Sequence, residues 1–298
     1  KTHGPYTNVK NHRCDINWFD IYEEENNPYL DAFWKWWPEL SKELTILRIT
    51  GGEPTMQRST YKLFDYLDKN PQPKLELDVN SNFGGKPKQL EKFTDNVNNL
   101  LTNKKIRRFK LFTSIDTWGK RAEYIRDGLD INVFERNLDY FMKNTTAPVT
   151  FMITFNIFCV TTFQTLLEKI LEWRAKYNDV ETFRWNRISF DTPYLKEPLQ
   201  YDINILPKSY VKYMKNHLQF IKENLDDKRK DAFTTMEYEK FRRVVDYMEK
   251  TEYEPEKLML GRKDFHNYFA EQGRRRNVNH ETVFPEMEDF FKLCRELV

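Results

Sequence analysis

Apolar and polar positions alternate along the chain in a way that separates strands from helices from about residue 45 onward. The segments predicted as strands are rich in β-branched and aromatic residues, and they are 45–50, 74–80, 106–115, 148–158 and 181–190. The segments with helical spacing are about 57–69, 87–103, 119–142 with a break near Gly128, and 162–177. Strands and helices therefore alternate.

Such alternation predicts parallel βαβ units, because a parallel neighbour strand is reached through a crossover, usually a helix. Right-handed crossovers place the helices outside and bring the loops after the strands to one rim, where ligands bind. The predicted fold class is therefore α/β.

The pattern changes after Phe190. Residues 191–207 contain three prolines and no clear period, as expected of a connecting segment. The helices predicted beyond it are 208–225, 232–251, about 256–271 and 284–297. We therefore expect an α/β unit over 1–190, a linker over 191–207 and a helical C-terminal extension over 208–298. Near the N-terminus, 28–43 reads as a helix, and we expect the aromatic residues Trp18, Trp34, Trp36 and Trp37 to serve packing.

Composition narrows the function classes. The 298 residues include 48 Lys+Arg and 46 Asp+Glu, so a net charge of +2 offers no global field for nucleic acid or anionic membrane. A hydrophobic fraction of 39% with 15% aromatics argues against disorder. Since the sequence shows neither an apolar run of about 18 residues nor a signal-peptide pattern, we expect a cytoplasmic protein without a membrane span.

The three cysteines, Cys14, Cys159 and Cys294, are far apart in sequence and form no CxxC or CxxxC motif. They predict neither a disulfide framework nor a local metal loop, and small buried side chains are the simpler interpretation. The five histidines have no metal-pair spacing. We predict no metal-ligating residues.

The first chemical candidate is LRITGGEPTM, in which Gly51, Gly52, Glu53 and Pro54 follow a predicted strand. Two glycines let the backbone turn and approach a ligand closely. Glu53 would stand at the carboxyl end of a parallel strand, where it could accept hydrogen bonds from an ammonium group. The alternative is a tight turn after which Pro54 starts a helix.

Polar residues also follow the next two strands. Ser81 and Asn82 end the strand of LELDVNSN, while Ser114 and Asp116 end the following one, with Arg126 shortly after. A hydroxyl, a carboxylate and a guanidinium on one rim could hold a ribose and an α-carboxylate. Each residue alone could equally be a helix cap or a solvated loop residue.

With these motifs the sequence resembles the radical S-adenosylmethionine (SAM) enzymes, and among them those with a twitch domain. LRITGGEPTM resembles the GGEP signature whose glutamate and glycine backbone hold the methionine amino group of SAM. SNF at 81–83 is similar to the turn after the third strand, and SID at 114–116 with YIRDG at 124–128 is similar to the segment around the cofactor's carboxylate and ribose. Asn156 matches a further cofactor contact, and FDTPYL at 190–195 and FPEMEDFFKLC at 284–294 resemble twitch-type sequences.

The resemblance implies a partial (β/α)6 barrel whose first strand is missing here, since five strands are predicted. It also implies a 4Fe-4S cluster held by CxxxCxxC, a motif that this chain lacks. We expect either a chain that begins after the cluster loop, so that only a full-length form carries the cluster, or a protein that binds without a cluster. The first account agrees with the missing strand and with a first residue that is Lys1.

Two functions from different classes follow. The first is a radical enzyme that forms a 5′-deoxyadenosyl radical to modify a peptide or small molecule, with flavodoxin or ferredoxin as the reductant that the resemblance implies. The second is a SAM- or nucleoside-binding module without redox activity. Cys159 is a minor candidate for a hydrogen-atom donor, and we expect no auxiliary cluster. Nucleic-acid binding through Arg274, Arg275 and Arg276 is the least favoured interpretation, because charge runs are usually solvated.

Overall fold

The computed structural model describes residues 27–177 and 186–298, and it shows strands and helices alternating along the first of these ranges. The elements up to the last strand are α1 (Pro28–Glu43), β1 (Ile46–Ile49), the 3-10 turn η4 (Pro54–Met56), α2 (Arg58–Lys69), β2 (Gln72–Ser81), α3 (Pro87–Thr102), β3 (Ile106–Ser114), α4 (Lys120–Ile125), α5 (Ile131–Asn144), β4 (Val149–Met152), η5 (Ile157–Cys159), α6 (Phe163–Lys176) and β5 (Ile188–Asp191).

The remainder of the described chain is helical. Its elements are η6 (Leu199–Tyr201), η7 (Ile203–Ile205), η8 (Lys208–Tyr210), α7 (Val211–Glu223), α8 (Thr235–Lys250), α9 (Pro255–Arg276), α10 (His280–Val283), η9 (Pro285–Met287) and α11 (Glu288–Arg295). The predicted helical C-terminal region is thus confirmed.

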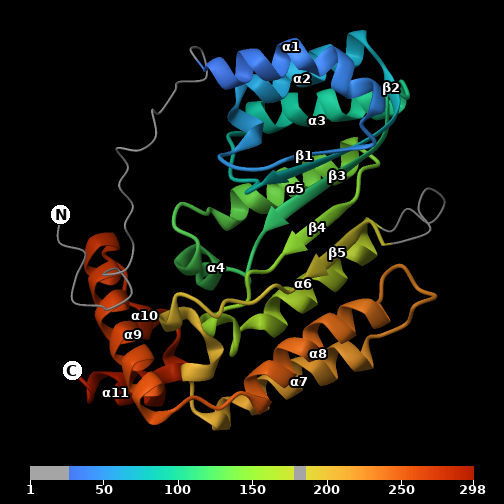
Figure 1. Cartoon of the computed structure of the whole chain (residues 1–298). Coiled ribbons are helices and arrows are strands. Elements are labelled where there is room, and N and C mark those ends of the chain that lie inside the picture. The colour runs from blue at the N-terminus through green and yellow to red at the C-terminus, as the bar shows by residue number, and fades with distance from the viewer. Residues whose placement is uncertain (1–26, 178–185) are drawn as a thin grey trace.

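The five strands form one parallel sheet in the order β1-β2-β3-β4-β5, so each strand lies beside its predecessor (Figure 1). This sequential order is the one found in (β/α) barrels, whereas doubly wound sheets reverse their strand order part-way. The α/β class is confirmed, and the arrangement is consistent with a partial barrel. All the strands end at the same edge of the sheet, so the loops that follow them share that edge.

The two faces of the sheet differ in chemistry. One face is apolar and buried, and its residues are Leu75, Leu77, Val79, Phe109, Leu111, Val149, Phe151, Ile188 and Phe190. The opposite face, here called the polar face, consists of Ile46, Arg48, Glu76, Asp78, Asn80, Arg108, Lys110, Phe112, Ser114, Thr150, Met152, Ser189 and Asp191. Parallel sheets usually bury apolar residues on both faces, so this alternation is unusual for its class.

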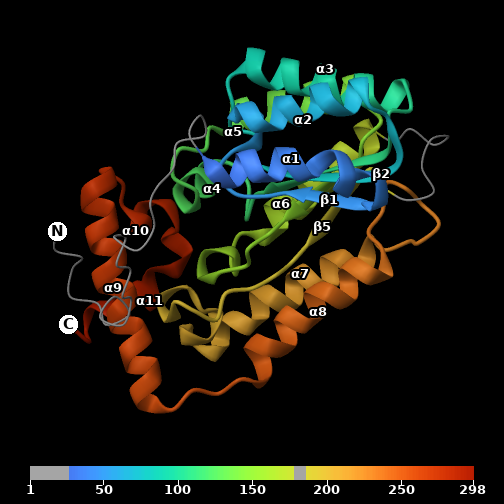
Figure 2. The same ribbon diagram turned by 45° about the horizontal axis from the view of Figure 1, so that its top comes forward.

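Aromatic rings attach three helices to the apolar face. Phe93 of α3 meets Phe109 at 5.9 Å between ring centroids, and Trp173 of α6 meets Phe151 at 5.1 Å. Phe134 of α5 contacts the same Phe151 at 6.3 Å. Edge-to-face and tilted contacts of this kind add to the stabilisation that comes from apolar burial. Figure 2 shows α1, α2 and α3 side by side above the sheet.

Two predicted strands end differently in the structure. The strand predicted over 148–158 is shorter, since β4 ends at Met152 and a single further bridge pairs Phe155 with Tyr194. The Asn156 side chain then accepts from the Phe158 N–H and starts η5. Of the strand predicted over 181–190, residues 181–185 lie outside the described residues, and β5 itself is Ile188–Asp191.

A buried ion pair lies along the outer edge of β5. The Arg174 Nε of α6 donates to the Ile188 carbonyl at 2.9 Å, and Glu237 Oε1 of α8 accepts from the Phe190 N–H at 3.2 Å. Arg174 and Glu237 also pair with each other at 2.5 Å, and both side chains are almost completely buried. Backbone groups of the last strand that a further strand would have paired are thus satisfied by side chains.

The segment 191–207 packs closely against α9. Leu199, Ile203 and Ile205 are buried, and a Cβ on Gly261 of α9 would lie 2.6 Å from Ile205 Cγ2. The domain boundary expected in this segment stays a prediction. At the other end, α1 has the predicted bounds, with Trp37 buried while Trp36 is 56% exposed. Packing thus accounts for Trp37 but not for Trp36, and Trp18 lies outside the described residues.

Removing one partner of the buried pair should destabilise the fold strongly. Replacing Glu237 by Gln leaves the Arg174 charge buried without its counter-charge, so we expect the free energy of unfolding to fall by about 3 to 5 kcal/mol. The matched control is Glu239→Gln, which breaks the exposed Arg242–Glu239 pair on the same helix and should cost less than about 1 kcal/mol. Urea unfolding measures both. Equal losses in the two variants would contradict the role given to the pair.

His217 predicts a loss of stability in mild acid. Burial lowers the pKa of its imidazole from 6.5 to about 4, although the Val160 carbonyl 2.9 Å from Nε2 favours protonation. Between about pH 6.5 and pH 4 the imidazole is therefore protonated in the unfolded chain but neutral in the folded one. The free energy of unfolding has its full value above this range and falls by about 3 kcal/mol as the pH is lowered through it. His217→Gln should flatten this pH dependence in urea unfolding. An unchanged slope would refute the assignment.

Candidate functional site

The turn after β1 is built by glycine and by a glutamate that caps the next turn. Gly51 and Gly52 have φ of 87° and 54°, a region that side chains rarely adopt. Glu53 Oε1 accepts from the Thr55 N–H at 3.2 Å and from its hydroxyl at 2.6 Å, and Pro54 occupies the first position of η4. The alternative interpretation of this segment, a tight turn after which a helical turn begins at Pro54, is therefore correct for the local backbone.

Glu53 also joins β1 to the end of β2, which a cap alone would not require. The Ser81 hydroxyl donates to Oε1 at 2.7 Å, and the Asn82 N–H donates to Oε2 at 2.8 Å. Oε1 thus accepts three hydrogen bonds and Oε2 accepts one. A carboxylate oxygen accepts more than one hydrogen bond. Oε2 has the capacity for an additional donor, such as an ammonium group.

Hydrogen bonds from α5 hold the loop after β2 in place. Phe83 is buried with φ of 57°, and the Asn137 amide donates to the carbonyls of Phe83 at 2.7 Å and Gly85 at 2.9 Å. The Asn82 side chain accepts from the Gly84 N–H at 2.8 Å. Tertiary contacts therefore hold a left-handed residue that local preference would disfavour. The sequence motif SNFGG showed the turn but not this support.

A second group follows β3. Asp116 is buried, pairs with Arg126 Nε at 2.8 Å and accepts from the Thr154 N–H at 2.8 Å. Burial raises the pKa of Asp116, while Arg126 and the Thr154 hydrogen bond act in the opposite direction. The carboxylate that Arg126 meets here is that of the protein itself, whereas the sequence suggested a ligand carboxylate. A ligand role for Arg126 stays a prediction.

The predicted site residues therefore form two groups at one sheet edge. Within the described ranges no hydrogen bond or ion pair joins the Glu53 group to the Asp116 group. Ser114 lies on the polar face, in register with Met152 of β4 and Asp191 of β5 through successive pairings. Convergence of Glu53, Ser114 and Arg126 on one cavity stays a prediction.

The remaining two candidates have local roles. Asn156 is buried and uses its side chain on Thr154 and Phe158. Cys159 is completely buried, and its Sγ accepts from the Asn156 N–H at 3.4 Å. Burial, followed by the charge of Asp116, raises the pKa of the Cys159 thiol. Cys159 therefore lies in the core rather than at an open rim, which agrees with a packing role.

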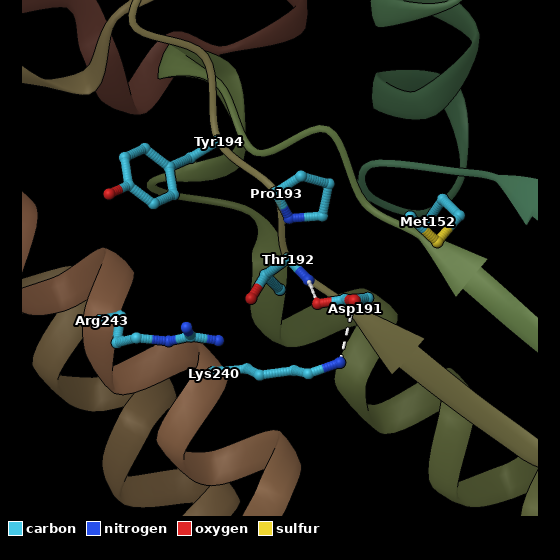
Figure 3. A pocket seen from close by; sticks show the side chains of 7 residues that line it. All are labelled: Met152, Asp191, Thr192, Pro193, Tyr194, Lys240 and Arg243. Carbon is cyan, nitrogen blue, oxygen red and sulfur yellow. Dashed lines mark hydrogen bonds and ion pairs between the residues drawn. The ribbon is translucent and has the colours of Figure 1, made fainter.

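The structure shows a pocket that the sequence interpretation did not include. It has a volume of about 260 Å³ and lies beyond the ends of β4 and β5, beside α8 (Figure 3). Its lining residues are Met152, Asp191, Thr192, Pro193, Tyr194, Lys240 and Arg243. Lys240 Nζ pairs with Asp191 at 2.8 Å. The sequence signal was the three-residue spacing of Lys240 and Arg243, which places both on one side of a helix.

A 4Fe-4S cluster does not fit the described residues. Across 27–177 and 186–298 no group of three or more His, Cys, Asp or Glu side chains could hold a metal ion. The cysteines there, Cys159 and Cys294, are both buried, and Cys14 lies outside the described residues. Such a cluster takes thiolate ligands, and the described residues do not supply a set of them.

Two other expectations concern surfaces. Among the described residues, no helix has the length and apolar character that crossing a membrane requires. Arg274 and Arg275 pair with Glu271, while Arg276 pairs with Asp127 and donates to the Tyr124 carbonyl at 2.7 Å. All three arginines thus have partners within the protein, and nucleic-acid binding remains the least favoured interpretation.

Comparisons with known proteins find no matching family model and no matching curated relative. A solved structure described as native anSMEcpe with bound AdoMet is similar, with 20% sequence identity and a TM-score of 0.44. The similarity covers 69% of this chain and 53% of that one, so this chain spans about half the length of that protein. The AdoMet belongs to that protein, and the similarity is too distant to indicate what this chain binds.

Reconstitution with iron and sulfide under anaerobic conditions tests the cluster question. We expect the 298-residue chain to hold far less iron than one 4Fe-4S cluster per protein, because its three cysteines do not form a three-thiolate loop. Iron and sulfide analysis with an absorption spectrum measures this. Full iron content with a cluster spectrum would contradict the expectation.

Proposed function

We propose that this chain is the SAM-binding part of a radical SAM-type enzyme. The observation that supports it best is Glu53, whose carboxylate is held at the carboxyl edge of the sheet by Thr55, Ser81 and the Asn82 N–H. That edge is where α/β proteins bind ligands. The motif carrying Glu53 is also the most specific part of the resemblance to these enzymes.

Each site residue has a proposed role toward SAM. Glu53 Oε2 accepts from the ammonium of the methionine moiety, and the backbone of Gly51 and Gly52 lies against it, with the Gln57 side chain beside Gly52. A Cβ on Gly51 would have no atom within 4 Å, so the space beside this turn is open. Ser114 serves the ribose as a hydrogen-bonding group.

The Asp116–Arg126 pair serves the cofactor's carboxylate and ribose in this proposal. Arg126 Nε and one Nη are used on Asp116, while the side chain remains 29% exposed. A guanidinium has five N–H donors, so it can serve two carboxylates at once. Asn156 then supports the rim by ordering the start of η5.

With a cluster supplied by other residues, bound SAM would provide the radical chemistry, and the described residues would bind and orient the reactants. Because the described residues lack a cluster site, this reaction requires cysteine ligands that they do not provide. The proposed substrate is a peptide or small molecule, and the proposed reductant is flavodoxin or ferredoxin. The second candidate is a SAM- or nucleoside-binding module, favoured if no form of the protein has CxxxCxxC.

The role of Glu53 is testable by SAM binding. Glu53→Gln keeps the shape of the side chain and removes its charge, so we expect SAM affinity to fall by about tenfold to a hundredfold. Isothermal titration calorimetry measures the change. Glu39→Gln, on the exposed side of α1, is the matched control and should bind like the parent.

If Glu53→Gln retains full affinity while folding normally, the cofactor site is wrongly assigned. Whether any form of the protein carries CxxxCxxC separates the two functions. A form with CxxxCxxC that binds a cluster should produce 5′-deoxyadenosine on reduction, and one that binds SAM but never cleaves it supports the binding module.

A further inference from the structure

Positive side chains outnumber carboxylates over the polar face and its pocket. The cations are Arg48, Arg108, Lys110, Lys240 and Arg243, and the carboxylates are Glu76, Asp78 and Asp191. Glu76 is used by Arg108, and Asp191 is used by Lys240. Among the described residues, neither Arg48 nor Arg243 has a carboxylate within ion-pair distance.

The cations lie close enough to repel one another. The Arg48 guanidinium lies 4.0 Å from the centre of the Phe112 ring, and Lys110 Nζ lies 4.7 Å from the same centre. Burial lowers the pKa of Lys110; Asp78 opposes this, while Arg108, Arg48 and Lys240 lower it further. Lys240 of α8 is thus within electrostatic reach of Lys110 in the middle of the sheet.

A polar group without a partner also faces the pocket. Thr192 is only 5% exposed, and its Oγ1 has no hydrogen-bond partner in the described structure. Figure 3 shows this hydroxyl on the side of the pocket where Lys240 and Arg243 extend from α8. Buried hydroxyls normally have a hydrogen-bond partner, and leaving one without a partner is unfavourable. An acceptor atom of a ligand would satisfy it.

We propose that this pocket binds an oxyanion, the phosphate or carboxylate group of a small-molecule substrate, between Arg243, Lys240 and the Thr192 hydroxyl. A guanidinium matches such a group with two parallel hydrogen bonds, while Lys240 adds charge and Thr192 donates. Arg48 and Lys110 continue the positive surface across the sheet, so the rest of an anionic substrate can lie against these two side chains, which cover the Phe112 ring.

The size of the pocket, and a lining with the two cations Lys240 and Arg243 against the single carboxylate Asp191, favour a small anionic group. A volume of about 260 Å³ accommodates the charged end of a ligand rather than a whole large one. A metal ion or an ammonium group would be repelled by the excess of cations. The assignment of the oxyanion to a substrate rests on the proposed function, whereas its binding to this pocket does not.

Phosphate titration followed by ³¹P NMR tests the pocket. We expect inorganic phosphate to bind the intact chain and Arg243→Gln to weaken that binding by about five- to tenfold. The matched control is Arg242→Gln, which removes the same charge from the neighbouring position on α8, where Arg242 pairs with Glu239. This control should change phosphate affinity less than twofold.

Three results would overturn the proposal. The first is that phosphate does not bind. The second is that both variants weaken phosphate binding equally, which indicates a nonspecific effect of charge. The third is that phosphate displaces SAM, which assigns the pocket to the cofactor. Glutarate added as a competitor distinguishes the two chemistries, since a pocket for carboxylates releases phosphate at lower glutarate than a pocket for phosphates does. Loss of SAM binding in Glu53→Gln is read separately, so the two proposals can fail independently.

Discussion

The buried pair between Arg174 and Glu237 is the contact on which the arrangement of the described chain depends. It closes the outer edge of the last strand, and it does so with one side chain from α6, which belongs to the βα alternation, and one from α8, which belongs to the helical C-terminal region. Two charges without water are stable only when their hydrogen bonds are complete. Here both side chains bond the backbone of β5 as well as each other, so the geometry of the strand and the helix is fixed together.

The same pair determines where the pocket is. Glu237 precedes Lys240 by three residues and Lys240 precedes Arg243 by three, so each side chain neighbours the next along α8. Because Glu237 is anchored to β5, Lys240 and Arg243 are carried to the end of that strand, opposite Thr192 and Tyr194. The candidate site therefore combines a rim formed by loops of the sheet with cations from a separate helical region.

Much of the fold was predictable because each element buries a periodic set of apolar residues. The bounds of α1 and α2 agree with the periodicity within one residue, and the parallel order follows from strands and helices that alternate. The turn η5 was not predictable in this way, because TFNIF has the composition of a strand, whereas a side-chain cap from Asn156 starts a helical turn there. Periodicity reports burial, whereas capping depends on where one side chain points.

In the candidate site, too, some contacts could be predicted from the sequence and others could not. GGEP, Ser81 and Asn82 could be connected from sequence because all follow neighbouring parallel strands. The pairing of Arg126 with Asp116 was missed, since a charged residue after a strand looks the same whether it meets a ligand or the protein. Lys240 and Arg243 were missed because nothing local to α8 says which strand it packs beside.

The support of the loop after β2 by Asn137 has a consequence for binding thermodynamics. Two amide hydrogen bonds from α5 hold the carbonyls of Phe83 and Gly85, and thereby the strained residue between Asn82 and Gly84. The order of this loop is supplied by folding, so a molecule that meets it does not have to immobilise it. Association at this edge loses little chain entropy, and small ligands with few contacts can bind there with useful affinity.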